Sequence, residues 1–84
     1  MAKEYATQLR EWRAQNPLRL WRKEKGLSRN DAATALNCAA NTLWNWENGS
    51  ITPNEENMTK LAAMMDVPTL RQTWAAWLAQ KPQL

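Results

Sequence analysis

Residues 27–53 read LSRNDAATALNCAANTLWNWENGSITP, and this stretch decides the fold. Ser28 followed by Asp31 is a variant capping box, which predicts that a helix begins directly after Ser28. Asn37 predicts where that helix ends, because asparagine adopts the left-handed conformation of a tight turn almost as readily as glycine. A second helix is then expected over residues 40–47. The stretch therefore predicts two short helices joined by a tight turn.

Two helices are expected upstream of this stretch. The first covers residues 3–14, where apolar residues recur at helical spacing at Tyr5, Leu9 and Trp12. Asn16 then supplies an N-cap and Pro17 a first-turn proline, which predicts a helix over residues 17–25.

Two more helices are expected downstream. Asn54 can cap a helix that runs until Pro68 breaks the pattern, and Thr69 followed by Gln72 is another capping-box pattern that opens a last helix to about residue 80. Strand signals are absent, because the β-branched residues are scattered. The expected fold class is all-α, a compact bundle of about five to six short helices.

The composition excludes several classes of function. The apolar stretches of this 84-residue chain are too short to cross a bilayer, and its N-terminus lacks a signal-peptide core, so we expect a cytoplasmic protein. One cysteine and no histidine allow neither an internal disulfide nor the usual zinc ligands, and the commonest general base is missing. We therefore expect no metal, no cofactor, no evident small-molecule ligand and no enzymatic activity.

Charge is distributed unevenly along the chain. Residues 1–29 hold eight basic side chains against three acidic ones, whereas residues 30–84 hold three basic against five acidic. A positive N-terminal third attracts polyanions and adds salt-dependent affinity for phosphates. An ordinary solvated helix face has the same composition, so charge alone leaves both interpretations open.

Residues 27–53 resemble the DNA-binding domains of the lambda-repressor and Cro type, which are called the XRE family. The residues that match the family pattern are a Trp-Glu-Asn-Gly segment and a later proline, namely Trp46, Glu47, Asn48, Gly49 and Pro53. The resemblance covers roughly residues 17–78. It implies a helix-turn-helix at residues 28–48 whose second helix enters the major groove of DNA.

The resemblance also implies structural roles. Family members often carry an internal ion pair at the positions of Arg22 and Glu47, although Arg22 can also hold a phosphate. Ala33 lies where the two helices of the motif cross, and the space around it is filled by Leu36, Cys38, Leu43 and Trp46.

The exposed residues at the start of the recognition helix are the candidates for base contacts. Asn41 and Asn45 lie four residues apart on one face, and each amide can pair with adenine. Ala40 offers an apolar contact to a thymine methyl group. Trp44 either packs in the groove or covers a neighbouring helix. Ala39 stands where the family often has a capping serine, so this cap is lost or comes from elsewhere.

Phosphate contacts are expected from Arg29 at the start of the first motif helix and from Asn48 after the recognition helix, both at family phosphate-contact positions. The loop residues Ser50 and Thr52 are further candidates. Asn48 can also act as a C-capping residue before Gly49, and the two roles are compatible.

The chain is divided into an N-terminal extension over residues 1–15, a helix-turn-helix domain over 16–80 and a tail over 81–84. The extension is interpreted as an added helix, a DNA-contacting arm or a packing element. Because one recognition helix reads few base pairs, a homodimer on a palindromic operator is expected. The last helix either supplies the dimer interface or closes the core over Trp21, through Trp74, Trp77 and Leu78.

Two functional hypotheses follow. The first is a sequence-specific transcriptional regulator bound to double-stranded DNA, most simply a repressor of the phage or plasmid type. The second is an antitoxin or adaptor that holds a protein partner through the tryptophan-rich last helix.

Overall fold

The computed structural model describes residues 4–83, and within that range it contains six helices and no strand. The helices in chain order are α1 (Tyr5–Ala14), α2 (Pro17–Glu24), α3 (Arg29–Ala35), α4 (Ala40–Glu47), α5 (Glu55–Met65) and α6 (Leu70–Ala79). The expected all-α class is confirmed. The expected start of the first helix at residue 3 lies outside the described residues, as does the last residue of the 81–84 tail.

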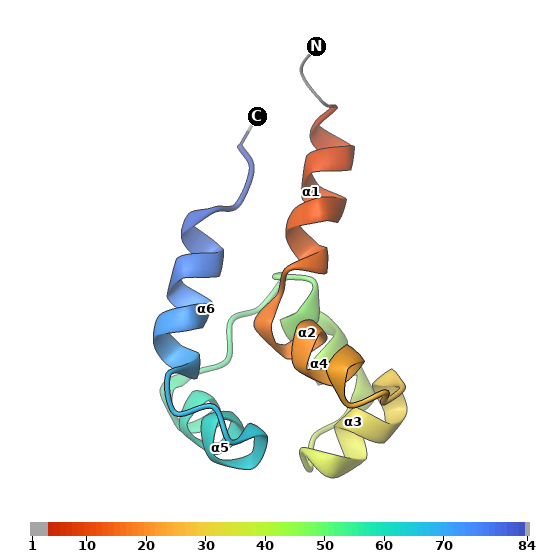
Figure 1. Cartoon of the computed structure of the whole chain (residues 1–84), viewed down its shortest axis with the longest axis vertical. Coiled ribbons are helices and arrows are strands. Elements are labelled where there is room, and N and C mark those ends of the chain that lie inside the picture. The colour runs from red at the N-terminus through yellow and green to blue at the C-terminus, as the bar shows by residue number, and fades with distance from the viewer. Residues whose placement is uncertain (1–3, 84) are drawn as a thin grey trace.

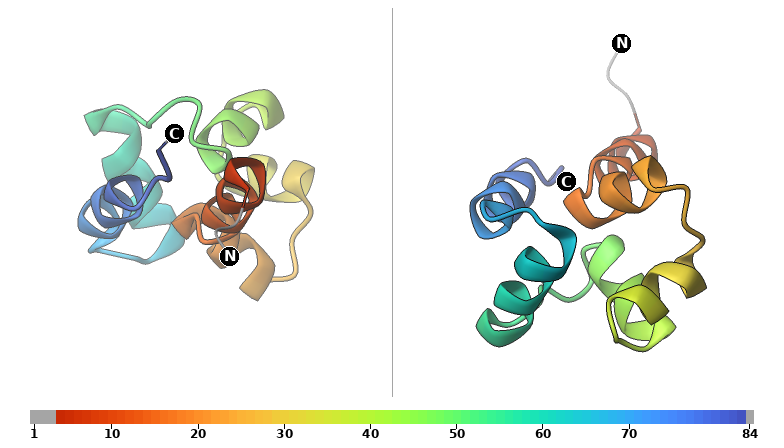
Figure 2. Two further views of the ribbon diagram at one scale, coloured as in Figure 1. Left: turned by 90° about the horizontal axis from the view of Figure 1, so that it is seen from above. Right: turned by 60° about the horizontal axis from the view of Figure 1, so that its bottom comes forward.

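The helices form an elongated molecule of 42 × 24 × 20 Å. α1 and α6 rise side by side at one end, while α3 and α5 lie at the other (Figure 1). Figure 2 shows α5 and α6 on one side and the α3–α4 pair on the other. α2 lies between the two sides and packs against both α4 and α6. This central helix therefore joins the α3–α4 pair to the rest of the bundle.

The α3–α4 pair begins and turns as the sequence predicts. The Ser28 hydroxyl accepts a hydrogen bond from the Asp31 N–H at 3.1 Å, which caps α3. Asn37 has φ 54° and so takes the left-handed conformation of the turn. Ala39 precedes α4 in an extended conformation and offers no side-chain cap. The first turn of α4 is left without the hydroxyl acceptor that a serine would supply.

The predicted capping box at Thr69 is wrong. An N-cap residue has an extended backbone, but Thr69 has φ −95° and ψ 16°, and its hydroxyl makes no cap bond. Its carbonyl instead accepts a hydrogen bond from the Thr73 hydroxyl at 3.0 Å. By contrast, the predicted cap at Asn54 is present, where Oδ1 accepts from the Asn57 N–H at 2.8 Å.

The core lies where α2, α4, α5 and α6 face one another. Leu18, Leu43 and Leu70 are fully buried in it. Ala33 is buried where α3 packs on α4, and its small side chain permits the close approach of these helices. Cys38 is half-buried and packs against the same core, as expected.

Trp12 and Trp77 join α1 to α6 through a stacked pair of indole rings. The ring centroids are 4.0 Å apart and the planes differ by 1°. Each indole N–H donates to the other residue's carbonyl, at 2.7 Å from Trp12 and 2.8 Å from Trp77. Trp74 meets Trp77 edge-on at 5.7 Å. Of the three roles considered for residues 1–15, packing is the one that the described part of the segment shows.

The burial of these rings favours the core interpretation of Trp74 and Trp77 over the dimer-interface one. Trp74 is 1% and Trp77 is 4% exposed within a single chain, and Leu78 is half-buried. The rings fill the core of the molecule, so a partner could reach them only if that core opened. The core interpretation applies, with Trp12 rather than Trp21 as the stacking partner of Trp77.

Gly49 fits directly against this stacked pair. It has φ 77°, and a Cβ at this position would lie 2.6 Å from Trp12 Cη2 and 3.1 Å from Trp77 Cη2. Only glycine meets both the backbone and the spatial requirement. The glycine that ends α4 thus fixes the distance between that end and the α1–α6 pair.

Candidate nucleic-acid interface

α4 presents two chemically different faces. Leu43 and Trp46 point into the core, at 0% and 5% exposure. Three of the candidate base-reading residues lie away from them, with Asn41 and Trp44 exposed and Asn45 half-buried. Ala40 is not exposed as expected, because it is half-buried and packs against the core. The helix is therefore anchored by apolar packing along one side and offers amide groups and an indole on the other.

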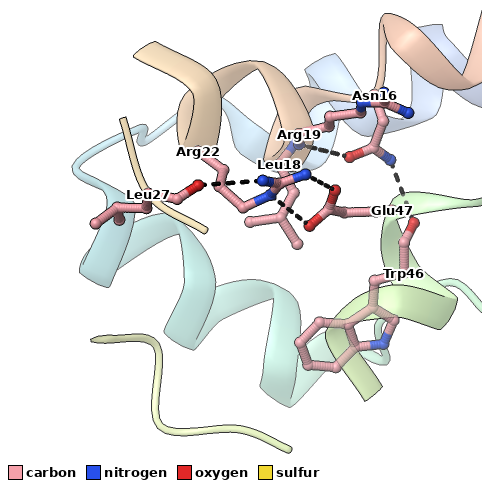
Figure 3. Close-up of polar contacts among 7 residues, drawn as sticks. All are labelled: Asn16, Leu18, Arg19, Arg22, Leu27, Trp46 and Glu47. Carbon is pink, nitrogen blue, oxygen red and sulfur yellow. Dashed lines mark hydrogen bonds and ion pairs between the residues drawn. The ribbon is translucent and has the colours of Figure 1, made fainter. Parts of the chain in front are cut away.

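An ion pair fixes the C-terminal end of α4 to α2. Arg22 donates from Nε to Glu47 Oε2 and from Nη2 to Glu47 Oε1, both at 3.0 Å (Figure 3). Its third nitrogen donates to the Leu27 carbonyl at 3.1 Å. The Glu47 side chain is 3% exposed and that of Arg22 is 12% exposed. Such a bidentate pair fixes orientation, because both partners are desolvated and each would be costly to leave alone.

Asn16 adds a second link between the same helices. It is fully buried, and its Oδ1 accepts from the backbone N–H groups of Leu18 and Arg19, which caps α2 (Figure 3). Its Nδ2 donates to the Trp46 carbonyl at 3.2 Å. The sequence predicted the cap but not the bond to α4, because that bond joins residues 30 positions apart.

Arg29 and Trp44 lie against each other on the outer surface of the α3–α4 pair. The Arg29 guanidinium lies 4.2 Å from the centroid of the Trp44 ring, in cation–π geometry. Trp44 remains 45% exposed. The two interpretations of Trp44 are therefore compatible, because one ring face covers α3 while part of the indole stays open to solvent.

Three of the four candidate phosphate ligands line one pocket. This pocket has a volume of about 210 Å³ and includes Arg29, Asn48 and Ser50. Thr52 is exposed and lies outside its lining. Asn48 is also the C-cap residue of α4, so its structural role is present in the same place.

Two arginines that sequence reasoning did not select line the same pocket. They are Arg13 from α1 and Arg19 from α2. Arg13 Nε donates to the Asn48 carbonyl at 3.1 Å, which ties α1 to the end of α4. The only sequence signal was the excess of basic residues in the N-terminal third, which does not show which of them converge. Their convergence depends on the packing of α1 through Trp12.

Other classes of site find little support in the described chain. Burial raises the pKa of the Cys38 thiol, which disfavours the thiolate that a nucleophile or metal ligand requires. Residues 4–83 contain no group of three or more acidic or cysteine side chains placed to hold a metal ion. No helix in this range is long and apolar enough to span a membrane.

Comparison with known families agrees with this geometry. A family model described as helix-turn-helix matches residues 18–71. The chain belongs to the helix-turn-helix family. The match includes α3 and α4, which form the motif of this XRE-type, lambda-repressor-like domain, whereas α1 and most of α6 lie outside it. No curated protein and no solved structure matches the chain.

Family membership sets the general function. This helix-turn-helix protein is a DNA-binding transcription regulator, and its partner is double-stranded DNA. In this family the second motif helix is the one placed in the major groove. That helix is α4, so the amides of Asn41 and Asn45 lie on the element that reads DNA in helix-turn-helix proteins.

Proposed function

We propose that the protein is a repressor that occupies a specific operator through α4. The observation that carries this proposal is the rigid placement of α4. Its inner side is held by Leu43 and Trp46, and its end is held by the Arg22–Glu47 pair. A recognition helix fixed in this way can discriminate between bases, because small errors of position cost hydrogen bonds.

Asn41 and Asn45 are the proposed base readers. Each amide can donate to N7 and accept from N6–H of adenine, so each favours an A·T pair at its position. Ala40 would contact a thymine methyl group at the same groove floor. Trp44 would lie along the flank of the groove, where its open edge can contact sugars and bases.

Arg29, Asn48, Ser50 and Thr52 are the proposed phosphate ligands, and they would set the register of α4 on the duplex. Arg29 and Asn48 line the same pocket as Trp44. Contacts of this kind carry little base preference but supply much of the affinity.

The operator is proposed to be palindromic and bound by a homodimer. A single recognition helix reads few base pairs, and two-fold dimers place their helices about 34–36 Å apart, one turn of DNA. Because Trp74 and Trp77 are buried, the dimer contact must use other surface. The exposed apolar side chains available for it in the described chain include Leu20, Ile51 and Met64.

The alternative of an antitoxin or adaptor loses its structural basis. It relied on a tryptophan-rich face of the last helix, and the indoles of that face are buried against α1 and the core. No observation in the described chain favours it over DNA binding.

Operator selection from random DNA, followed by footprinting and a salt titration, tests the proposal. We expect a palindrome protected in two successive major grooves. Asn45→Ala should relax base preference at one position of each half-site, costing about 1–3 kcal/mol for the preferred base. Arg29→Ala should instead weaken binding to all sequences alike.

Gln72→Ala is the matched control for the asparagine variant, since it removes an exposed amide from α6, outside the motif. It should leave base preference unchanged. The repressor proposal fails if no selected sequence competes better than random DNA at moderate salt, or if Asn45→Ala and Gln72→Ala have the same preference.

A further inference from the structure

The pocket lined by Arg13, Arg19 and Arg29, called the arginine pocket below, lies where α1, α2, α3 and α4 meet. Each of these helices supplies part of its lining. We propose that this pocket binds one phosphodiester group of the DNA backbone, with Arg13, Arg19 and Arg29 as its cationic ligands. The inference rests on the proposed DNA-binding function and deepens it. Its new element is that α1, which lies outside the family match, contributes directly to DNA affinity.

The charge of the pocket suits an anion. Three guanidinium groups line it, and Glu47 is the carboxylate among the described lining residues. Both Glu47 oxygens are already held by Arg22, and that side chain is only 3% exposed. The negative charge of Glu47 is therefore matched by Arg22, and the positive charge of the three lining arginines remains to attract a phosphate.

Unsatisfied hydrogen-bond donors in the pocket also favour the binding of an anion. Among the described residues, Arg19 Nε and Arg29 Nε are buried and have no hydrogen-bond partner. A buried donor without an acceptor is costly, and the oxygens of a phosphodiester are strong acceptors. Asn48 Oδ1 is also buried without a partner, but it is an acceptor, so the anion would be held from the arginine side of the pocket.

Arg13 is already oriented toward this place. Its Nε donates to the Asn48 carbonyl at 3.1 Å, which leaves the two terminal nitrogens available as donors. The Trp12–Trp77 pair fixes the helix that carries it. Arg29 is likewise oriented by the Trp44 ring. Because Trp44 lies both in the lining and on the exposed face of α4, the pocket opens beside the surface proposed to enter the major groove.

Arg13→Gln tests the inference through the salt dependence of operator binding. The slope of log K against log salt concentration is negative, and its magnitude should decrease by about 0.9, the value for one lost phosphate contact. Binding at low salt should weaken about tenfold. Arg10→Gln is the matched control, because Arg10 is exposed on the same helix and outside the pocket lining. The salt slope of Arg10→Gln should lie closer to the wild-type slope than the salt slope of Arg13→Gln does.

Arg13→Lys separates phosphate binding from a purely structural role. It retains the charge but loses the Nε bond to the Asn48 carbonyl, so it should largely retain the wild-type salt slope. A residue that only holds α1 in place would lower the melting temperature in both Arg13 variants and leave both slopes at the wild-type value. That result would overturn the inference.

Ethylation interference identifies the source of the phosphate. Ethylating one backbone phosphate per half-site should weaken wild-type binding and have much less effect on Arg13→Gln. The inference is overturned if wild type and Arg13→Gln both bind the operator specifically and have the same interference pattern and the same salt slope. Stabilisation of the wild type alone by inorganic phosphate would then show that the pocket binds free phosphate and not the DNA backbone. If the wild-type protein selects no operator, the proposed function itself fails, and this inference, which depends on it, fails as well.

Discussion

Replacing Gly49 by alanine should destabilise the protein more than replacing Gly26 in the same way. Both glycines have positive φ values, 77° and 69°, so alanine at either position would cost about 1–2 kcal/mol in backbone strain. A Cβ at Gly26 would meet nothing within 4 Å, whereas one at Gly49 would lie 2.6 Å from Trp12 Cη2. Overpacking of this kind costs about 1–3 kcal/mol more. We therefore expect about 1–2 kcal/mol for Gly26→Ala and about 2–5 kcal/mol for Gly49→Ala.

Urea unfolding followed by far-UV circular dichroism measures both free energies. Trp12→Phe provides a further check, because phenylalanine lacks the indole atoms Cζ3 and Cη2 that the new methyl group would meet. In that background the cost of Gly49→Ala should fall toward the Gly26→Ala value. The reasoning is refuted if Gly49→Ala costs no more than Gly26→Ala, or if its cost is the same with Trp12 and with phenylalanine.

Two further substitutions test the support of α4. Ala39→Ser should add the missing N-cap and raise the free energy of unfolding by about 0.5–2 kcal/mol, seen as a higher melting temperature; an unchanged or lower value would contradict it. Glu47→Ala should cost about 3–5 kcal/mol in urea unfolding, because it leaves Arg22 largely buried without its partner, and a loss below about 1 kcal/mol would show that the pair is not important for stability.

The helices were predictable because their signals are local. Ser28, Asn37 and Asn54 act on backbone groups within a few residues, and the structure places all three as the sequence indicates. Thr69 has the residue pattern of a cap but not the extended backbone, which depends on how the preceding turn leaves α5. A local pattern therefore identifies where a helix begins but not always which group caps it.

The site was only partly predictable, because part of it is assembled by distant contacts. The motif residues of α4 are consecutive in the chain, and their spacing placed Asn41, Trp44 and Asn45 on the correct face but Ala40 on the wrong one. Arg13 reaches Asn48 across 35 positions, and Trp12 reaches Trp77 across 65. No periodicity links such pairs, since their proximity arises only when α1 packs against α6 and against the end of α4. The burial of Trp74 and Trp77 depends on the same packing of α1 against α6.

The stacked tryptophans also determine how the protein should be divided. The family match spans residues 18–71, so it begins after Trp12 and ends before Trp77. A fragment with these limits would lack both indoles, and Gly49 would face water where two rings now cover it. Domain boundaries for expression or for transfer of the motif into another protein should therefore follow the tryptophan pair, not the family match.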